Sequence, residues 1–84
     1  MVGLMYVYVL KSQSARKSYV GLTDDVRRRL HEHNSGRHAY TKRHMPWIIV
    51  HHERCATLND ARTREKYLKS AAGRRFLKVN VFKS

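Results

Sequence analysis

The chain has 84 residues, enough for one small domain over residues 1–84 and too few for a second domain of ordinary size. Eighteen lysines and arginines against six acidic residues give a formal net charge of +12, so the expected partners are polyanions, nucleic acid first and an anionic membrane surface second. No apolar run could cross a bilayer, no basic leader precedes a cleavage site, and Cys55 as the single cysteine excludes an intrachain disulfide, which suits a reducing cytoplasm.

The first element is predicted to be a strand over residues 4–10, a continuous apolar run rich in tyrosine and valine. Alternation divides its side chains between two faces, with Tyr6, Tyr8 and Leu10 on one and Met5, Val7 and Val9 on the other. A second strand over about residues 17–21 is expected to pair back antiparallel as a hairpin. Tyr8 and Tyr19 then lie near each other, either as packed core aromatics or as functional phenols.

A helix is predicted next, because its start carries three capping residues, Thr23, Asp24 and Asp25. One face of this helix holds residues at i, i+3, i+4 and i+7, namely Val26, Arg29, Leu30 and His33. The two apolar members turn this face toward the core, so Arg29 and His33 are expected at a buried seam. The alternative for Arg29 is a side chain whose stem packs on the core while its guanidinium reaches water.

This helix is predicted to end near Asn34, and Arg28 is expected to pair with Glu32 across one of its turns. The segment that follows, residues 37–45, carries five potential cations and one tyrosine, Tyr40. It is either a solvated loop or a loop that contacts nucleic-acid phosphates while Tyr40 stacks on a base.

Residues 47–52 predict a third strand, β-branched and aromatic enough to be central or near-central. A second helix starts at Thr57, with Asp60 completing a capping box. Its predicted stripe is apolar except for one carboxylate, and consists of Leu58, Ala61, Glu65, Leu68 and Ala72. A charge within an apolar stripe needs a partner, so Glu65 is expected either to pair with an arginine, for which Arg29 is a candidate, or to bind a divalent metal ion.

The C-terminal residues 73–84 are compatible with a strand or with a short closing helix. A further alternative is a zinc site made of His44, His51, His52 and Cys55. Their spacing matches no tight tetrahedral pattern, and adjacent histidines in a strand face opposite ways, so this alternative is disfavoured.

Two tyrosines on a hairpin, a cation and an imidazole on the next helix, and a later carboxylate are the groups that phosphodiester hydrolysis requires. In this order they resemble the GIY-YIG nuclease family. The second family triplet appears as Tyr19-Val20-Gly21, and the first is degenerate, Tyr6-Val7-Tyr8, with Tyr6 in place of glycine. Arg29 stands eight residues after Gly21, as the family arginine does, His33 follows one turn later, and Glu65 matches the family glutamate.

The resemblance, closest to small stand-alone members and to the nuclease domain of excision-repair and structure-selective endonucleases, implies an α/β fold. Its expected architecture is a small three-stranded, mainly antiparallel sheet flanked by helices, which favours a helix at the C-terminus. It also implies a metal-dependent DNA endonuclease of the cytoplasm that acts in repair or recombination. The Leu22 side chain stands where several family members carry polar or basic groups.

The resemblance assigns roles to five residues: Glu65 holds Mg²⁺ or Mn²⁺, Arg29 neutralises the scissile phosphate, Tyr8 activates water, Tyr19 orients it or shares that role, and His33 contacts phosphate or relays a proton. The expected contacts to DNA are Arg27, Arg37, Tyr40, Lys42 and Arg43. Target choice would come from this domain, a homodimer or a partner protein. The alternative function is a basic nucleic-acid-binding module whose nuclease site is vestigial or depends on a partner.

Overall fold

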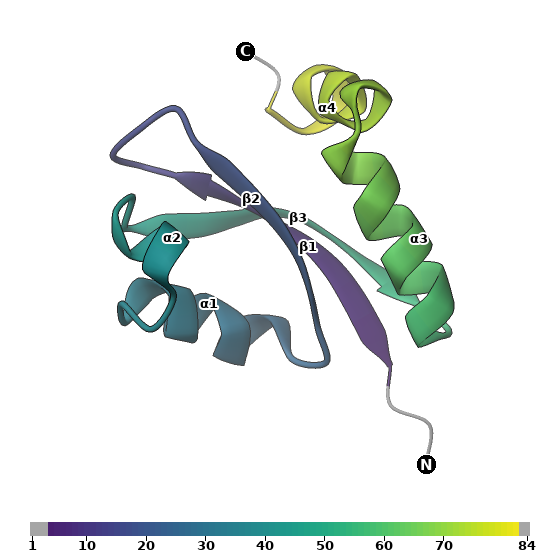
Figure 1. Ribbon diagram of the computed structural model, residues 1–84, viewed down its shortest axis with the longest axis horizontal. Coiled ribbons are helices and arrows are strands. Elements are labelled where there is room, and N and C mark those ends of the chain that lie inside the picture. The colour runs from purple at the N-terminus through teal and green to yellow at the C-terminus, as the bar shows by residue number, and fades with distance from the viewer. Residues whose placement is uncertain (1–3, 83–84) are drawn as a thin grey trace.

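The fold is a three-stranded antiparallel sheet with helices on both faces. The structure is a computed structural model that describes residues 4–82. The sheet order is β2-β1-β3, and α1 and α2 cover one side of it while α3 and α4 cover the other (Figure 1). The elements in chain order are β1 (Met5–Ser12), β2 (Ser18–Thr23), α1 (Val26–Asn34), α2 (Ala39–Lys42), β3 (Trp47–Cys55), α3 (Leu58–Lys69), α4 (Ala71–Leu77) and a π-helical turn, η1 (Lys78–Phe82). The predicted fold class is therefore confirmed.

Strand β1 supplies the core on both faces of the sheet because its side chains alternate as predicted. Val7 and Val9 pack with residues of α3 and α4, whereas Tyr8 and Leu10 pack with Trp47 and with apolar residues of α1. All four of these β1 side chains are at most 1% exposed. The hairpin prediction is also confirmed, since β1 and β2 pair antiparallel with Tyr8 opposite Gly21 and Leu10 opposite Tyr19.

Strand β3 is an edge strand, so its predicted central position is wrong. It pairs only with β1, with an irregularity in register between Val9 and Leu10, and it continues past the predicted end to Cys55. The centre belongs to β1, since only β1 is apolar on both faces, while β3 exposes His52 and Arg54. The β-branched run of β3 fits a strand covered on one face.

The helix boundaries follow the capping residues. The side chain of Asp25 accepts from the backbone N–H of Arg28 at the start of α1, and Thr57 accepts in the same way from Asp60 before α3. Helix α3 ends at Lys69, because Ser70 caps a new helix, α4, by accepting from the backbone N–H of Gly73.

The apolar stripe predicted for the second helix is therefore partly wrong. Ala61 and Leu68 are buried, but Leu58 is exposed and Ala72 lies exposed on α4. The C-terminal segment is helical through Phe82, as the family resemblance implied. Predictions that concern residues 1–3, including the absence of a leader, and residues 83–84 lie outside the described residues.

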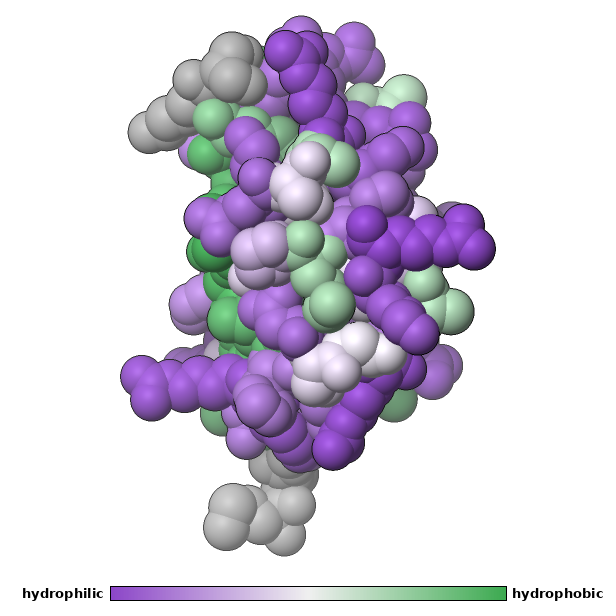
Figure 2. Space-filling model, turned by 90° about the vertical axis from the view of Figure 1, so that its left-hand side faces the viewer, coloured by the Kyte–Doolittle hydropathy of each residue, from purple (hydrophilic) through white to green (hydrophobic). Residues whose placement is uncertain are grey.

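The surface is rich in polar and charged side chains, as the composition requires. Figure 2 shows long hydrophilic side chains over most of one face, with small hydrophobic areas between them. Among residues 4–82, no helix has the length and apolar character needed to cross a membrane.

Candidate active site

The hydroxyl of Tyr8 is the centre of a buried hydrogen-bond network. Its oxygen lies 2.8 Å from Nε2 of His33 and 3.3 Å from Nε of Arg29, both on α1. On the other side of the imidazole, Nδ1 of His33 lies 2.8 Å from the Thr41 hydroxyl on α2. Tyr8 is 1% exposed, and both His33 and Thr41 are 0% exposed, so the chain of groups is shielded from bulk water except beside Arg29, which is half-buried.

The environment keeps Tyr8 and His33 neutral at pH 7. Burial raises the pKa of the Tyr8 phenol to about 12, although the Arg29 guanidinium opposes the increase. Burial lowers the pKa of His33 to about 4, and the nearby His38 and Arg29 add to that decrease. Because the Arg29 Nε can only donate, the Tyr8 oxygen accepts from it and directs its own proton to Nε2 of His33. Nδ1–H of His33 then donates to Thr41.

Gly21 makes room for the phenol of Tyr8. A Cβ atom at position 21 would lie 2.6 Å from the Tyr8 oxygen and 3.0 Å from a ring carbon of Tyr19, much closer than van der Waals contact. The glycine of the second triplet therefore lets the Tyr8 ring lie directly over β2. The centroids of the Tyr8 and Tyr19 rings are 6.2 Å apart, so the predicted proximity of the two tyrosines is confirmed.

Arg29 is half-buried at the edge of the network, as predicted, and its carboxylate partner is Glu32. Nη1 of Arg29 donates to Oε1 of Glu32 over 2.8 Å. The alternative pairing of Arg29 with Glu65 is wrong, because Glu32 lies one turn away on the same helix. The predicted contact between Arg28 and Glu32 is present at 3.5 Å, and Arg28 also pairs with Asp24 at 2.6 Å.

Glu65 reaches the same region from the opposite face of the sheet. Its helix, α3, packs on β1 and β2, and its carboxylate accepts from Nζ of Lys69 over 2.9 Å. Its charge lies close enough to Tyr8 to raise the pKa of that phenol, as a smaller cause after burial and the neighbouring Tyr19. Residues from α1 and from both strands of the hairpin are therefore in contact at Tyr8, and Glu65 of α3 lies within electrostatic range of it.

The donor set at Glu65 fits a metal ion that the substrate helps to hold. Among residues 4–82, no three His, Cys, Asp or Glu side chains are grouped as metal ligands. Mg²⁺ is commonly bound through one or two carboxylates while waters and substrate phosphates supply its other ligands. A single half-buried carboxylate such as Glu65 is compatible with that mode. The disfavoured zinc alternative has no support, since His51 instead pairs with Glu53 at 2.8 Å.

The segment after α1 is partly ordered as helix α2 instead of being wholly a loop. Tyr40 is 49% exposed, and its ring centroid lies 6.3 Å from that of Tyr19, so it borders the site. The four cations that were expected to contact DNA are all exposed: Arg27, Arg37, Lys42 and Arg43. They are therefore accessible to a polyanion.

Thr41 and His38 are site residues that the sequence reasoning missed. Thr41 is bonded to His33 by its hydroxyl, and its carbonyl accepts from Nε1 of Trp47 over 2.7 Å. The His38 ring stacks on that of His33 with centroids 4.5 Å apart. The sequence carried no clear signal for either residue, because a buried threonine or histidine cannot be distinguished from a surface one by residue type.

The comparisons with known proteins agree with this geometry. Residues 4–78 match the GIY-YIG catalytic domain. A UPF0213 protein of Haloquadratum walsbyi is 42% identical over 66 residues, which cover 77% of this chain and 73% of that protein. A UPF0213 protein of Staphylococcus haemolyticus is 33% identical over 75 residues, which cover 88% of this chain and 90% of that protein. No solved structure matches the chain. With the catalytic domain matched over almost the whole described chain, this protein belongs to the GIY-YIG nuclease family.

Proposed function

We propose that the protein is a divalent-metal-dependent DNA endonuclease that hydrolyses phosphodiester bonds in the cytoplasm, in DNA repair or recombination. The observation that carries the proposal is the Tyr8 hydroxyl held between Arg29 and His33, with Glu65 acting on the same phenol from the other face of the sheet. Arg29 would supply the cation and His33 the proton acceptor. Tyr8 would be the base and Glu65 the hard oxygen ligand for a metal ion, and hydrolysis of a phosphodiester needs groups of these kinds.

Arg29 and Glu65 supply the electrostatic part of the proposed reaction. Arg29 is half-buried, so its guanidinium can reach a phosphate at the surface and still contact Tyr8. Glu65 would hold Mg²⁺ or Mn²⁺, which when bound polarises the phosphate and stabilises its developing charge. Tyr19, also half-buried, would orient the attacking water or share the role of base with Tyr8.

Tyr8 and His33 supply the proton transfer. With a pKa of about 12, only on the order of 10⁻⁵ of Tyr8 is phenolate at pH 7, so the phenol needs an acceptor for its own proton. As the Tyr8 oxygen takes a proton from water, the proton it carries passes to Nε2 of His33, 2.8 Å away. Because His33 is fully buried, this relay suits it and direct contact with phosphate does not.

A bound substrate would favour this transfer. The positive charge of Arg29 contributes to the low pKa of His33, so a phosphate paired with Arg29 would raise that pKa. Neutralising the charge of Glu65 would remove one of the causes that raise the pKa of Tyr8. Both changes make it easier to move a proton from Tyr8 to His33.

The test is a cleavage panel of single-stranded, duplex, flap and branched DNA with Mg²⁺ and with Mn²⁺. Arg29→Ala, Glu65→Gln and Tyr8→Phe are each expected to reduce the rate on the order of 10³-fold or more while the fold and most DNA binding remain. Arg28→Ala is the matched control, because Arg28 is an exposed arginine on the same helix that does not contact Tyr8. Cleavage that continues in EDTA would contradict the metal requirement.

A second function is favoured by the ion pairs that occupy the two charged groups of the site. Arg29 is bonded to Glu32 and Glu65 to Lys69, so in the free chain each charged group is partly occupied by a residue of its own helix. This arrangement supports a nucleic-acid-binding module whose nuclease activity depends on a partner protein or a homodimer. Binding without cleavage of every DNA in the panel would favour that function over an autonomous endonuclease.

A further inference from the structure

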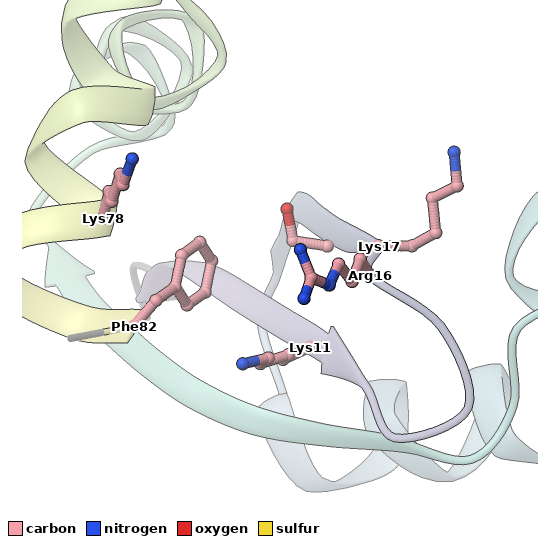
Figure 3. Close-up of a pocket in the computed structure, with 6 residues that line it drawn as sticks. Lys11, Arg16, Lys17, Lys78 and Phe82 are labelled. Carbon is pink, nitrogen blue, oxygen red and sulfur yellow. The ribbon is translucent and has the colours of Figure 1, made fainter. Parts of the chain in front are cut away.

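A second cluster of cations surrounds a hollow at the opposite end of β2 from α1. The hollow has a volume of about 580 Å³, and we name it the hairpin hollow after the β1–β2 hairpin that forms one wall. The other wall is the C-terminal turn η1, which contributes Lys78 and Phe82 (Figure 3). Its lining residues are Lys11, Arg16, Lys17, Ser18, Lys78 and Phe82.

Among the residues that the structure describes, the cations of the hairpin hollow have no acidic partner. Four of its six lining residues are cations and none is acidic. Within residues 4–82, the ion pairs involve other residues, so the ammonium and guanidinium groups of the hollow are without carboxylate partners. A wall of unpaired cations is a site for phosphate groups, and its electrostatic field adds to the net charge of the chain.

The hollow also contains an aromatic ring. Figure 3 shows the Phe82 ring directed into the space between Lys78 and the hairpin cations. The ammonium of Lys11 lies 5.7 Å from the centroid of this ring. Cations that follow a sugar–phosphate backbone, together with an aromatic ring on which a base can stack, are the combination that binds single-stranded nucleic acid. A base within a duplex is already stacked on its neighbours, so the ring selects an unpaired nucleotide.

A smaller hollow lies next to the hairpin hollow on the α3 side of β2. It has a volume of about 240 Å³, shares Ser18 and Phe82 with the hairpin hollow, and is also lined by Tyr19 and Lys69. Tyr19 borders Tyr8, and Lys69 is the ion-pair partner of Glu65. The smaller hollow therefore extends from the hairpin cations along β2 to Lys69, the ion-pair partner of Glu65.

We infer that the hairpin hollow binds an unpaired nucleotide together with its flanking phosphates. This nucleotide belongs to the strand that continues from the scissile phosphate. The preferred substrates therefore carry a single-stranded segment next to the cleaved bond. The path of the DNA strand from the scissile phosphate to the hollow rests on the proposed nuclease function. Binding of single-stranded DNA by the hollow does not rest on it, because binding can be measured without cleavage.

The test is the affinity for a labelled oligothymidylate and for a matched blunt duplex, measured by fluorescence anisotropy in EDTA over a salt series. Phe82→Leu keeps an apolar side chain but removes the stacking ring, and is expected to weaken single-strand binding roughly 5- to 150-fold with little effect on duplex binding. Phe82→Tyr should retain single-strand affinity. Equal effects of Phe82→Leu on single strand and duplex would overturn the stacking role.

The phosphate contacts are tested by Lys11→Gln combined with Lys78→Gln. Loss of two phosphate contacts is expected to reduce the slope of log Kd against log salt by about 1.4 for the oligothymidylate. The matched control is Arg54→Gln with Arg62→Gln, which removes the same charge from exposed positions that line neither hollow. An unchanged slope in the lysine variant, or an equal decrease in the control, would overturn the inference. A wild-type protein that binds but never cleaves would contradict only the nuclease function.

Discussion

Gly21→Ala tests whether the position of the Tyr8 phenol determines activity. The added Cβ would lie 2.6 Å from the Tyr8 oxygen and 2.7 Å from Cζ of the same ring. Ordinary contacts begin at 3.4 Å, so the oxygen must move by about 0.8 Å, the difference between 3.4 and 2.6 Å. The ring cannot move freely, because Tyr8 is 1% exposed and its hydroxyl is bonded to His33 and Arg29.

A displacement of this size is expected to reduce kcat on the order of 10²-fold, since a misplacement near 1 Å has that effect on reacting groups. The overpacking itself is expected to lower the free energy of unfolding by about 1–3 kcal/mol. Single-turnover cleavage and urea unfolding measure the two effects separately. Both experiments are carried out below the temperature at which the variant unfolds.

Gly36→Ala is the matched control. Gly36 has φ of 82°, which an alanine adopts at a cost of about 1–2 kcal/mol, so its stability should fall by a similar amount. The nearest atom to its added Cβ is Cγ of Lys42 at 3.9 Å, and the active site is not displaced. Gly36→Ala should therefore lose stability but keep kcat. Equal kcat values for Gly21→Ala and the wild type, or equal losses of kcat in both variants, would refute the reasoning.

Three further predictions concern stability. Folding lowers the pKa of His33 to about 4, so between about pH 6.5 and about pH 4 the unfolded chain binds a proton that the folded chain does not. The free energy of unfolding should therefore fall by up to about 1.4 kcal/mol per pH unit as pH decreases through this range. His33→Gln should remove this contribution, which is measured by comparing urea unfolding curves at about pH 7 and about pH 5. Asn34→Ala should cost about 1–3 kcal/mol in thermal unfolding, because its amide bonds both the N–H and the carbonyl of Trp47, whereas Asn34→Asp should retain the bond to that N–H. Gly73→Ala should cost at least about 1–3 kcal/mol, since its Cβ would lie 2.0 Å from the carbonyl oxygen of Tyr67, and an unfolding midpoint equal to that of the wild type would contradict the close helix junction.

The parts of the fold that depend on local pattern could be predicted from the sequence. Alternation in β1 separated its two faces correctly, because side chains of a strand must point to opposite sides. The caps at Asp25 and Thr57 fixed two helix starts, since their side chains satisfy free backbone N–H groups. The family resemblance grouped Arg29 and His33 with Tyr8, and both lie within hydrogen-bond distance of the Tyr8 hydroxyl.

Features that depend on tertiary competition could not be predicted in this way. A β-branched strand is compatible with the centre or with an edge, and only the comparison of all three strands gives β1 the centre. Arg29 had two candidate carboxylates, and the nearer one on its own helix forms the pair. The role of Thr41 depends on helix α2 folding back over His33, a contact between groups eight residues apart that no periodicity indicates.

The small size of the sheet is what allows the proposed site to form. Tyr8 lies on the face covered by α1, and Glu65 approaches from α3 on the other face. A β-sheet would normally separate groups on opposite faces, but only β2 stands between Tyr8 and the edge. Neighbouring strands are about 4.8 Å apart, so a single strand separates Tyr8 from the edge by a distance over which the charge of Glu65 can still interact with the phenol. A fourth strand paired to β2 would bury this edge, so the proposed cleavage would require β2 to remain unpaired.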